Sequence, residues 1–291
     1  MRVLLLMNPQ ARRGEEFRPA VMEAFAKADC KVIAEPPGLD DGGTALMKQY
    51  RDAVDCVVVG GGDGTLIAAI PGLIETRLPL GILPLGTFND LARTLSIPLA
   101  PAAAVDVIVA ASLRAIDVGR VGDRYFLNEA SIGISTRIAR RQTPEIKKRF
   151  GFLAIIATTL NTLRFSRPFS VEVRYEGKQE RFRTVQLTVA NSHRFGGFIT
   201  DKSAAIDDGM LDLYSLELKR WTDVLPLFGK IIRGNISQAR AVRDRRAATF
   251  EVRTTRPHHI FTDGEPAGMT PAIFEVVPKA LQVYVPAPGV P

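Results

Sequence analysis

The chain reads Val57-Val58-Val59-Gly60-Gly61-Gly62-Asp63-Gly64-Thr65-Leu66 where a short apolar segment passes into a helical pattern. Glycines at such a junction let the backbone turn sharply and come close to a ligand. Successive backbone amides and a helix N-terminus there form a cradle for phosphate. The stretch lacks the P-loop lysine, and its glycine spacing differs from a dinucleotide-binding fingerprint. It therefore predicts an anion site outside both standard nucleotide motifs. The alternative is a tight turn in which Asp63 only caps the helix.

Similar apolar runs and helical segments extend through the first third of the chain. Apolar runs without alternation, as expected for strands covered on both faces, occupy residues 3–6, 32–34 and 80–83. Residues 17–28 and 44–51 carry apolar side chains at helical spacing. The fold class predicted for residues 1–115 is α/β, a three-layer domain with a mainly parallel sheet.

Beyond about residue 112 the pattern changes to strands that alternate or form hairpins. Gly122-Asp123 and Glu176-Gly177 provide tight turns, and residues 171–175 and 182–187 alternate between inward and outward positions. Helical patterns interrupt this region at residues 146–163 and 221–240. The second predicted domain, residues 116–291, is antiparallel and β-sandwich-like.

The composition limits the classes of function that the chain can serve. Cys30 and Cys56 are the only cysteines and form no spaced pair, which argues against a disulfide framework or a thiolate zinc site. No stretch approaches the roughly 20 apolar residues that a membrane-spanning helix needs. The net charge of +7 favours polyanionic partners. We therefore expect a soluble or peripheral protein in a reducing compartment.

Basic residues concentrate between Arg137 and Arg167, where eight of them accompany a single acid, Glu145. The aromatic residues of this segment lie within its apolar stretch instead of alternating with the bases. That arrangement suits a lipid interface better than a base-stacking platform. We therefore expect an anionic membrane surface as a partner and no nucleic acid.

A second glycine-bearing loop follows the apolar run at residues 80–83. It reads Pro84-Leu85-Gly86-Thr87-Phe88-Asn89-Asp90-Leu91-Ala92-Arg93 and again opens a helix. In an open parallel sheet, neighbouring loops at the carboxyl ends of strands share one crevice. The two loops together predict a ligand site, and plain N-capping by Asn89 and Asp90 is the alternative.

Two carboxylates lie two residues apart in Phe261-Thr262-Asp263-Gly264-Glu265-Pro266, where a predicted strand breaks into a turn. Phosphoryl transfer to an alcohol needs one carboxylate to accept or orient the hydroxyl proton, and others to hold magnesium against the phosphates. The candidates for these roles are Asp63, Asp90, Asp117, Asp263 and Glu265. The alternative is a hairpin turn with solvated acids.

The order and spacing of seven segments point to a known family. They are Gly-Gly-Asp-Gly-Thr at 61–65, Pro84-x-Gly-Thr-x-Asn-Asp90, Ile116-Asp117-Val118-Gly119, Tyr125-Phe126-Leu127-Asn128, Gly196-Gly197, Asp208-Gly209-Met210-Leu211-Asp212 and Asp263-Gly264-Glu265. Together they resemble the diacylglycerol kinase catalytic family, in its soluble bacterial lipid kinase branch, which is related to sphingosine and ceramide kinases. The resemblance covers nearly the whole chain, and its first two segments are the specific ones.

The resemblance implies an ATP site and a need for Mg²⁺. The residues that it assigns to nucleotide binding are Asn8, Pro9, Gly61, Gly62, Asp63, Gly64, Thr65, Leu66, Thr87 and Asn89. It implies that Glu265 accepts the hydroxyl proton. The acidic, magnesium-linked network that it implies consists of Asp263, Asp63, Asp90 and Asp117, and Arg93 is a candidate to balance these acids. It also implies a structural Mg²⁺ bound by the Asp208 carboxylate and by the carbonyls of Ala205 and Met210.

The chain departs from the family pattern in three places. Gln10-Ala11-Arg12-Arg13-Gly14 replaces a small residue and glycine, Glu35-Pro36-Pro37 replaces a threonine pair, and Ile67-Ala68 replaces Asn-Glu. We therefore expect a retained phosphate cradle and an altered pocket for the nucleotide base.

A lipid must present its hydroxyl while its tails stay near the bilayer, which calls for an apolar cleft beside a basic rim. Each surface Lys or Arg contributes about 1 kcal/mol toward an anionic leaflet. Candidate basic residues are Arg12, Arg13, Arg140, Arg141, Lys147, Lys148, Arg149 and Arg164, and candidate apolar contacts are Phe150, Phe152, Ile155, Ile156 and Leu163. The alternative is a helix whose apolar residues pack on the β domain while its bases are solvated.

The resulting hypothesis is a cytoplasmic enzyme, reversibly associated with the inner face of the membrane, with its active site in the cleft between two domains. It transfers the γ-phosphate of ATP to a membrane lipid, with diacylglycerol as the first choice, and a homodimer is left open. The alternatives are a ceramide or sphingoid-base kinase, a NAD kinase, and a catalytically silent, nucleotide-regulated lipid-binding protein.

Overall fold

The computed structural model describes residues 1–8, 14–34, 41–133, 167–192, 194–195, 198–199, 205–217 and 241–287. The chain divides into two units, the first comprising Met1–Val118 with Pro278–Pro291 and the second comprising Gly119–Val277. The sequence analysis placed all of residues 116–291 in a second domain. In the structure the C-terminal residues belong to the first unit, because Val283 pairs with Leu80 in the parallel sheet.

A parallel sheet forms the centre of the first unit, in the strand order β2-β1-β3-β4-β18. Its strands are β1 (Arg2–Met7), β2 (Lys31–Ala34), β3 (Cys56–Gly61), β4 (Leu80–Pro84) and the end of β18 (Ala272–Tyr284). Every residue of β3 and β4 is buried. Burial on both faces explains why their sequences are apolar runs without alternation.

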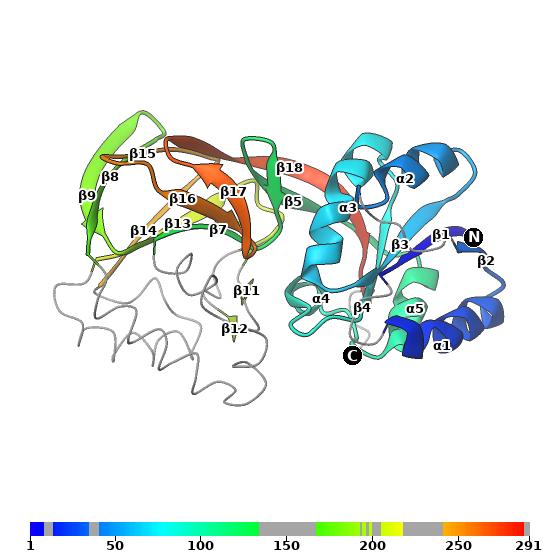
Figure 1. Cartoon of the computed structure of the whole chain (residues 1–291). Coiled ribbons are helices and arrows are strands. Elements are labelled where there is room, and N and C mark those ends of the chain that lie inside the picture. The colour runs from blue at the N-terminus through cyan, green and yellow to red at the C-terminus, as the bar shows by residue number, and fades with distance from the viewer. Residues whose placement is uncertain are drawn as a thin grey trace. The chain divides into compact units, whose positions relative to one another are not determined.

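Helices cover both faces of this sheet, which makes the first unit a three-layer α/β structure as predicted. They are α1 (Gly14–Lys27), α2 (Thr44–Tyr50), α3 (Asp63–Thr76), α4 (Asp90–Thr94) and α5 (Pro101–Val109). Figure 1 shows α2 and α3 on one face and α1 and α5 on the other.

The strand order creates a switch point beside β1. From β1 the chain first builds β2 on one side and then crosses to β3 on the other. At such a point the connections leave the sheet in opposite directions, and the carboxyl ends of the strands border a crevice where ligands bind in open α/β sheets. Asn8 follows β1 and Gly62 follows β3, so both lie at this crevice.

The second unit packs two antiparallel sheets face to face, in agreement with the predicted β-sandwich-like domain (Figure 1). The first sheet consists of the beginning of β18, β15 (Thr249–Thr254), β8 (Phe169–Tyr175) and β9 (Lys178–Thr184). The second consists of β14 (Val242–Ala247), β13 (Leu211–Leu216), β10 (Gln186–Ala190), β7 (Glu129–Gly133), β16 (His259–Thr262) and β17 (Glu265–Met269). Apolar side chains from both sheets, including Val173 and Phe250 from the first and Leu187 and Leu213 from the second, form one buried cluster.

Short hairpins complete the described strands. They are β5 (Leu113–Val121) with β6 (Arg124–Phe126), and β11 (Arg194–Phe195) with β12 (Phe198–Ile199). The two predicted tight turns are confirmed, because Gly122 connects β5 to β6 and Gly177 connects β8 to β9. Their φ angles are +55° and +73°, in the left-handed region that glycine tolerates.

The predicted single strand at residues 182–187 is wrong, because the chain changes sheet at Val185. β9 ends at Thr184 in the first sheet, and β10 begins at Gln186 in the second. The Thr184 hydroxyl lies 2.7 Å from the Gln186 carbonyl and 3.0 Å from the Leu216 carbonyl, and it accepts a bond from the Gln186 amide. Alternation in the sequence continues through this corner, so it gives no sign of the break.

Several predicted features lie outside the described residues. They are Pro9, the bases Arg12, Arg13, Arg140, Arg141, Lys147, Lys148, Arg149 and Arg164, the apolar residues Phe150, Phe152, Ile155, Ile156 and Leu163, the pair Gly196-Gly197, and the helical patterns at 146–163 and 221–240.

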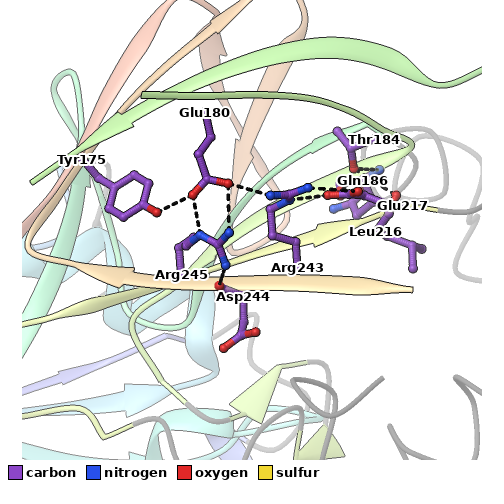
Figure 2. Close-up of polar contacts among 9 residues, drawn as sticks. All are labelled: Tyr175, Glu180, Thr184, Gln186, Leu216, Glu217, Arg243, Asp244 and Arg245. Carbon is purple, nitrogen blue, oxygen red and sulfur yellow. Dashed lines mark hydrogen bonds and ion pairs between the residues drawn. The ribbon is translucent and has the colours of Figure 1, made fainter. Parts of the chain in front are cut away.

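A polar cluster ties the edge strands of the two sheets together (Figure 2). Glu180 on β9 pairs with Arg243 and Arg245 on β14, each at 2.6 Å, and accepts a hydrogen bond from the Tyr175 hydroxyl. Arg243 pairs in addition with Glu217. The hydrogen bond from Arg245 is the largest of the influences that lower the pKa of Glu180 from 4.5 to about 2.

We expect the substitution Glu180→Gln to destabilise the protein at neutral pH and to have less effect in acid. A pKa below the unfolded value means that ionised Glu180 stabilises the fold above pH 4.5, and that this contribution disappears as the pH falls toward 2. The shift corresponds to about 3 kcal/mol. Urea unfolding at several pH values from 7 to 3 measures the difference between variant and wild type.

The matched control is Glu176→Gln in the exposed β8–β9 turn, which should change stability by less than about 0.5 kcal/mol. A stability difference for Glu180→Gln that stays constant from pH 7 to pH 3 would contradict this account of the cluster.

Candidate functional site

The predicted anion cradle lies at the junction of β3 and α3 in the first unit. Gly62 is the N-cap of α3 in an extended conformation (φ −97°, ψ −174°), and the helix begins at Asp63. The first backbone N–H groups of a helix have no helical partners and point toward an anion. A Cβ added to Gly64, in this first turn, would meet nothing within 4 Å. The Gly64 amide in the first turn of α3 therefore lies beside open space, while the Thr65 amide donates to the Gly62 carbonyl at 3.0 Å.

Asn8 joins the end of β1 to this cradle. Its amide donates to the Gly60 carbonyl at 2.8 Å, and its side-chain Nδ2 donates to the Thr65 hydroxyl at 3.1 Å. A Cβ on Gly61 would lie 2.4 Å from the same hydroxyl oxygen, so only glycine leaves room for Thr65 in this position. The side chains of Asn8 and Thr65 are thereby fixed at the crevice beside β1.

The β4–α4 loop is held in shape by Asn89. This residue is left-handed (φ 52°, ψ 49°), its Oδ1 accepts a bond from the Gly86 amide at 2.9 Å, and its Nδ2 donates to the Gly86 carbonyl at 3.1 Å. The N-capping alternative is wrong for Asn89, because its side chain makes no capping bond to α4 and closes the loop instead. Thr87 is exposed at the tip of this loop.

The two glycine loops touch each other through their backbones. A Cβ on Gly86 would lie 2.4 Å from the Gly62 Cα, and one on Gly62 would lie 3.1 Å from the Gly86 Cα. The Leu85 amide also donates to the Gly61 carbonyl at 2.9 Å. The two loops therefore lie side by side, as expected for neighbouring parallel strands.

Asp63 connects the start of α3 to the start of α4. Its Oδ1 accepts a hydrogen bond from the Leu91 amide at 3.3 Å. Burial raises the pKa of Asp63, and backbone hydrogen bonds, that of Leu91 first, counteract the rise. Asp90 lies beside it and is 3% exposed. Both acids are thus anchored where the two loops meet.

Asp117 of the expected acidic network, and Arg93, which was expected to balance it, make contacts of a different kind. Asp117 is 1% exposed and its Oδ1 accepts the Lys279 amide at 2.7 Å, so this carboxylate holds β18 against β5. Arg93 is exposed, and its Nε donates to the Phe88 carbonyl at 2.9 Å. Within the described ranges, no group of three His, Cys, Asp or Glu side chains is placed to hold a metal ion. The magnesium-linked network stays a prediction.

In the second unit, Asp263 and Glu265 differ sharply in their surroundings. Both oxygens of Asp263 accept backbone amides, from Leu127 at 2.7 Å, Asn128 at 3.0 Å and Glu129 at 2.9 Å. Glu265 begins β17 and is exposed, and its carboxylate makes no hydrogen bond or ion pair with a described residue. The hairpin turn that we considered as an alternative is present, but only Glu265 is a solvated acid.

Buried polar residues lie behind this turn, and of these only Asn128 was found from the sequence, whereas Glu129, Asn191 and Ser192 were not. Asn191 donates from Nδ2 to the Leu127 carbonyl at 3.0 Å, and the Ser192 hydroxyl donates to Asn128 Oδ1 at 3.1 Å. Asn128, Asn191 and Ser192 are each no more than 2% exposed, and Glu129 is 8% exposed. The sequence signal that could have found them is the polar pair Asn191-Ser192 directly after an alternating strand. Polar side chains that are buried at such a place nearly always have hydrogen-bond partners.

The carboxylate of Asp208, the expected ligand of a structural Mg²⁺, already pairs with an arginine side chain. Asp208 Oδ1 accepts the Met210 amide at 3.0 Å, and Oδ2 pairs with the Arg246 guanidinium. Arg246 also lies 3.9 Å from the Asp212 carboxylate. The carbonyls of Ala205 and Met210 are suitable oxygen ligands for Mg²⁺. The charge that would bind it is neutralised by Arg246, however, so these residues fit Mg²⁺ poorly and no chemical step is assigned to it there.

Comparison with known proteins covers both units. Residues 2–121 match the family model described as the diacylglycerol kinase catalytic domain. Residues 128–285 match the family model described as the YegS C-terminal NAD kinase beta sandwich-like domain.

Similar proteins are found over almost the entire chain. The chain is 31% identical to "Probable lipid kinase YegS-like" of Pseudomonas aeruginosa, over 98% of this chain and 95% of that protein. It is 30% identical to "Diacylglycerol kinase" of Bacillus subtilis, over 98% and 96%. The crystal structure of a diacylglycerol kinase from Bacillus anthracis str. Sterne matches with a TM-score of 0.82 at 26% identity, covering 99% of this chain and 98% of that one.

The contact between the loops predicts different outcomes for two glycine substitutions. Gly86→Ala should lower the free energy of unfolding by about 1–3 kcal/mol, because its methyl group would overlap the Gly62 backbone. Gly64→Ala should leave stability equal or slightly higher, because its methyl group enters open space in a helix. Thermal and urea unfolding measure both. Equal effects of the two substitutions would show that the loops are not in contact.

Proposed function

The chain belongs to the diacylglycerol kinase catalytic family, and on this premise we propose that it transfers the γ-phosphoryl group of ATP to the hydroxyl of a membrane lipid, with diacylglycerol as the first choice. One observation of the structure carries the proposal: two glycine loops meet by backbone contact at the carboxyl ends of β3 and β4, next to the switch point beside β1, and the Gly64 amide of α3 borders open space there. Such a surface binds phosphate chains without a P-loop lysine.

In the proposed complex, ATP phosphates lie against the first turn of α3. Glycine at positions 61 and 62 keeps the turn compact, the Gly64 amide faces the phosphates, and Thr87 lies at the tip of the neighbouring loop. Asn8 orients the Thr65 hydroxyl. Mg²⁺, when bound with the nucleotide, would neutralise charge on the phosphates, and Asp63 and Asp90 are the acids of the first unit suited to hold it.

Glu265 is the proposed proton acceptor. Its carboxylate is exposed and makes no bond within the described part of the chain, so it is available to a hydroxyl group. Asp263 positions it, because three backbone amides fix the turn from which β17 starts. As the lipid oxygen attacks phosphorus, the Glu265 carboxylate takes the hydroxyl proton and the terminal P–O bond of ATP breaks to release ADP. The convergence of Glu265 with Asp63 and Asp90 stays a prediction.

Association with the membrane is part of the proposal. No helix in the described ranges is long and apolar enough to cross a bilayer. The lipid hydroxyl would therefore be reached from the surface, and a basic chain with a net charge of +7 is attracted to anionic lipids of the cytoplasmic leaflet.

The substitution Glu265→Gln should lower kcat at least 100-fold, because general-base catalysis contributes about 10²–10⁴-fold. Asp63→Asn should abolish detectable transfer. Both variants should keep the wild-type circular dichroism spectrum and unfolding midpoint. Full activity of either variant would remove that residue from the mechanism.

The assay uses labelled ATP, Mg²⁺ and mixed micelles that contain diacylglycerol, ceramide or sphingosine, with NAD as a soluble acceptor in a separate reaction. Label in diacylglycerol supports the first choice, label in ceramide or sphingosine supports the close alternative, and label in NAD alone contradicts a lipid substrate. Transfer to none of them favours a catalytically silent protein.

Gly64→Ala provides a test of the phosphate cradle that does not depend on lipid. The methyl group occupies the open space that the phosphates would enter, so the Kd for ATP should rise at least tenfold while stability is retained. Isothermal titration calorimetry with a non-hydrolysable ATP analogue measures the affinity. Unchanged affinity would place the phosphates elsewhere.

A further inference from the structure

The outer face of the first sheet of the second unit is densely charged. Val171 and Val173 on β8 and Val252 on β15 point into the buried cluster. Because side chains alternate along a strand, the residues between them point outward. The outward residues are Glu251 and Arg253 on β15 with Thr255 just after it, Ser170, Glu172 and Arg174 on β8, and Gln179, Arg181 and Arg183 on β9.

The strand register places these residues in rows across the sheet. Arg253 lies opposite Glu172, which lies opposite Arg181. In the next row, Ser170 lies opposite Arg183. Directly opposed residues have Cβ atoms about 5 Å apart, so these side chains are immediate neighbours.

A pocket of about 480 Å³ occupies this end of the face. Three consecutive residues of each strand line it. They are Ser170, Val171 and Glu172 of β8, Arg181, Phe182 and Arg183 of β9, and Arg253, Thr254 and Thr255 at the end of β15. Three of these nine residues are arginines, and one is an acid. The lining therefore carries a net charge of about +2 at neutral pH, since arginine stays protonated and glutamate ionised.

The ion pairs on this face do not neutralise all of its positive charge. Glu172 pairs with Arg181 at 2.6 Å and with Arg174 at 3.0 Å, and Glu251 pairs with Arg253 at 2.6 Å. Two acids are thus shared among three arginines. Arg183 makes no ion pair with a described residue, and its Nη2 donates only to the Pro168 carbonyl, at 3.2 Å.

Simple cross-strand stabilisation accounts for part of this pattern. Opposite charges in register stabilise a sheet, and charged side chains on the edge strand β9 discourage pairing with other strands. Neither role requires an excess of arginine around a hollow, and an exposed ion pair of this kind contributes little. The features that need a partner are therefore the net positive charge of the lining and Arg183, which makes no ion pair with a described residue.

We propose that this pocket binds the phosphate group of an inorganic or esterified phosphate. Arginine presents planar N–H donors that match phosphate oxygens in a bidentate manner, and it is the preferred residue for such recognition. Arg183 and Arg253 supply the charge, and the exposed hydroxyls of Ser170 and Thr255 are further donors on the pocket lining. The proposal does not depend on kinase activity, because none of these residues belongs to the candidate functional site.

The test compares Arg183→Gln and Arg253→Gln with the matched control Arg174→Gln, which removes the same charge from the same face outside the pocket lining. Isothermal titration calorimetry with inorganic phosphate, at constant ionic strength with chloride as the reference anion, measures free phosphate. Sedimentation with phosphatidylglycerol vesicles, and with phosphatidylcholine vesicles as the uncharged reference, measures a lipid headgroup. A fourth protein, Gly64→Ala, reports phosphate held at the nucleotide site, because its methyl group enters the open space of the cradle.

We expect at least fivefold weaker binding for Arg183→Gln and Arg253→Gln, and less than a twofold change for Arg174→Gln and Gly64→Ala. That pattern with inorganic phosphate identifies a small phosphate ligand. The same pattern with phosphatidylglycerol vesicles alone identifies a lipid headgroup. No binding in either arm, equal losses in Arg183→Gln and Arg174→Gln, or a loss confined to Gly64→Ala would overturn the proposal. Urea unfolding of each variant shows that the comparison is made between folded proteins.

Discussion

The backbone contact between Gly62 and Gly86 is the constraint on which the candidate site of the first unit depends. β3 and β4 are parallel neighbours, so their loops leave the sheet at the same edge. A side chain at Gly86 would overlap the Gly62 backbone, and one at Gly62 would lie tightly against Gly86, so glycine at these positions keeps the loops together. With glycine at both positions, the N-termini of α3 and α4 remain close enough for Asp63 to bond the Leu91 amide. In our proposal, this backbone surface binds the phosphates without a lysine.

A comparable constraint in the second unit is the carboxylate of Asp263. Three successive amides satisfy it, and bonds from Asn191 and Ser192 hold the same loop from the other side. Buried amides must find acceptors, so one acid organises the whole turn. Glu265 emerges from this rigid turn with its own carboxylate unoccupied by described residues. The two acids of one short motif thus serve different purposes, structure for the first and, in our proposal, chemistry for the second.

Much of the fold could be predicted from the sequence because local patterns are strong where burial is uniform. The fully buried strands β3 and β4 are apolar runs, and the turns at Gly122 and Gly177 follow from the left-handed backbone that they require. The corner at Val185 could not be predicted in this way. Alternation continues through it, and the bonds that stabilise the corner reach Leu216, on a distant strand. The return of β18 to the first sheet depends equally on a remote partner, Leu80.

The sequence by itself determined which chemical groups the protein has and where the chain turns: two glycine loops after parallel strands, a set of acids, and a β-rich second half. Only the tertiary structure decided how each acid is used. Asp117 bonds a backbone amide 162 residues away, and Asp263 bonds one 136 residues away. Those partners are set by how strands pack and pair across the fold. No local pattern records them, because hydrogen-bond geometry depends on distance in space and the sequence gives only distance along the chain.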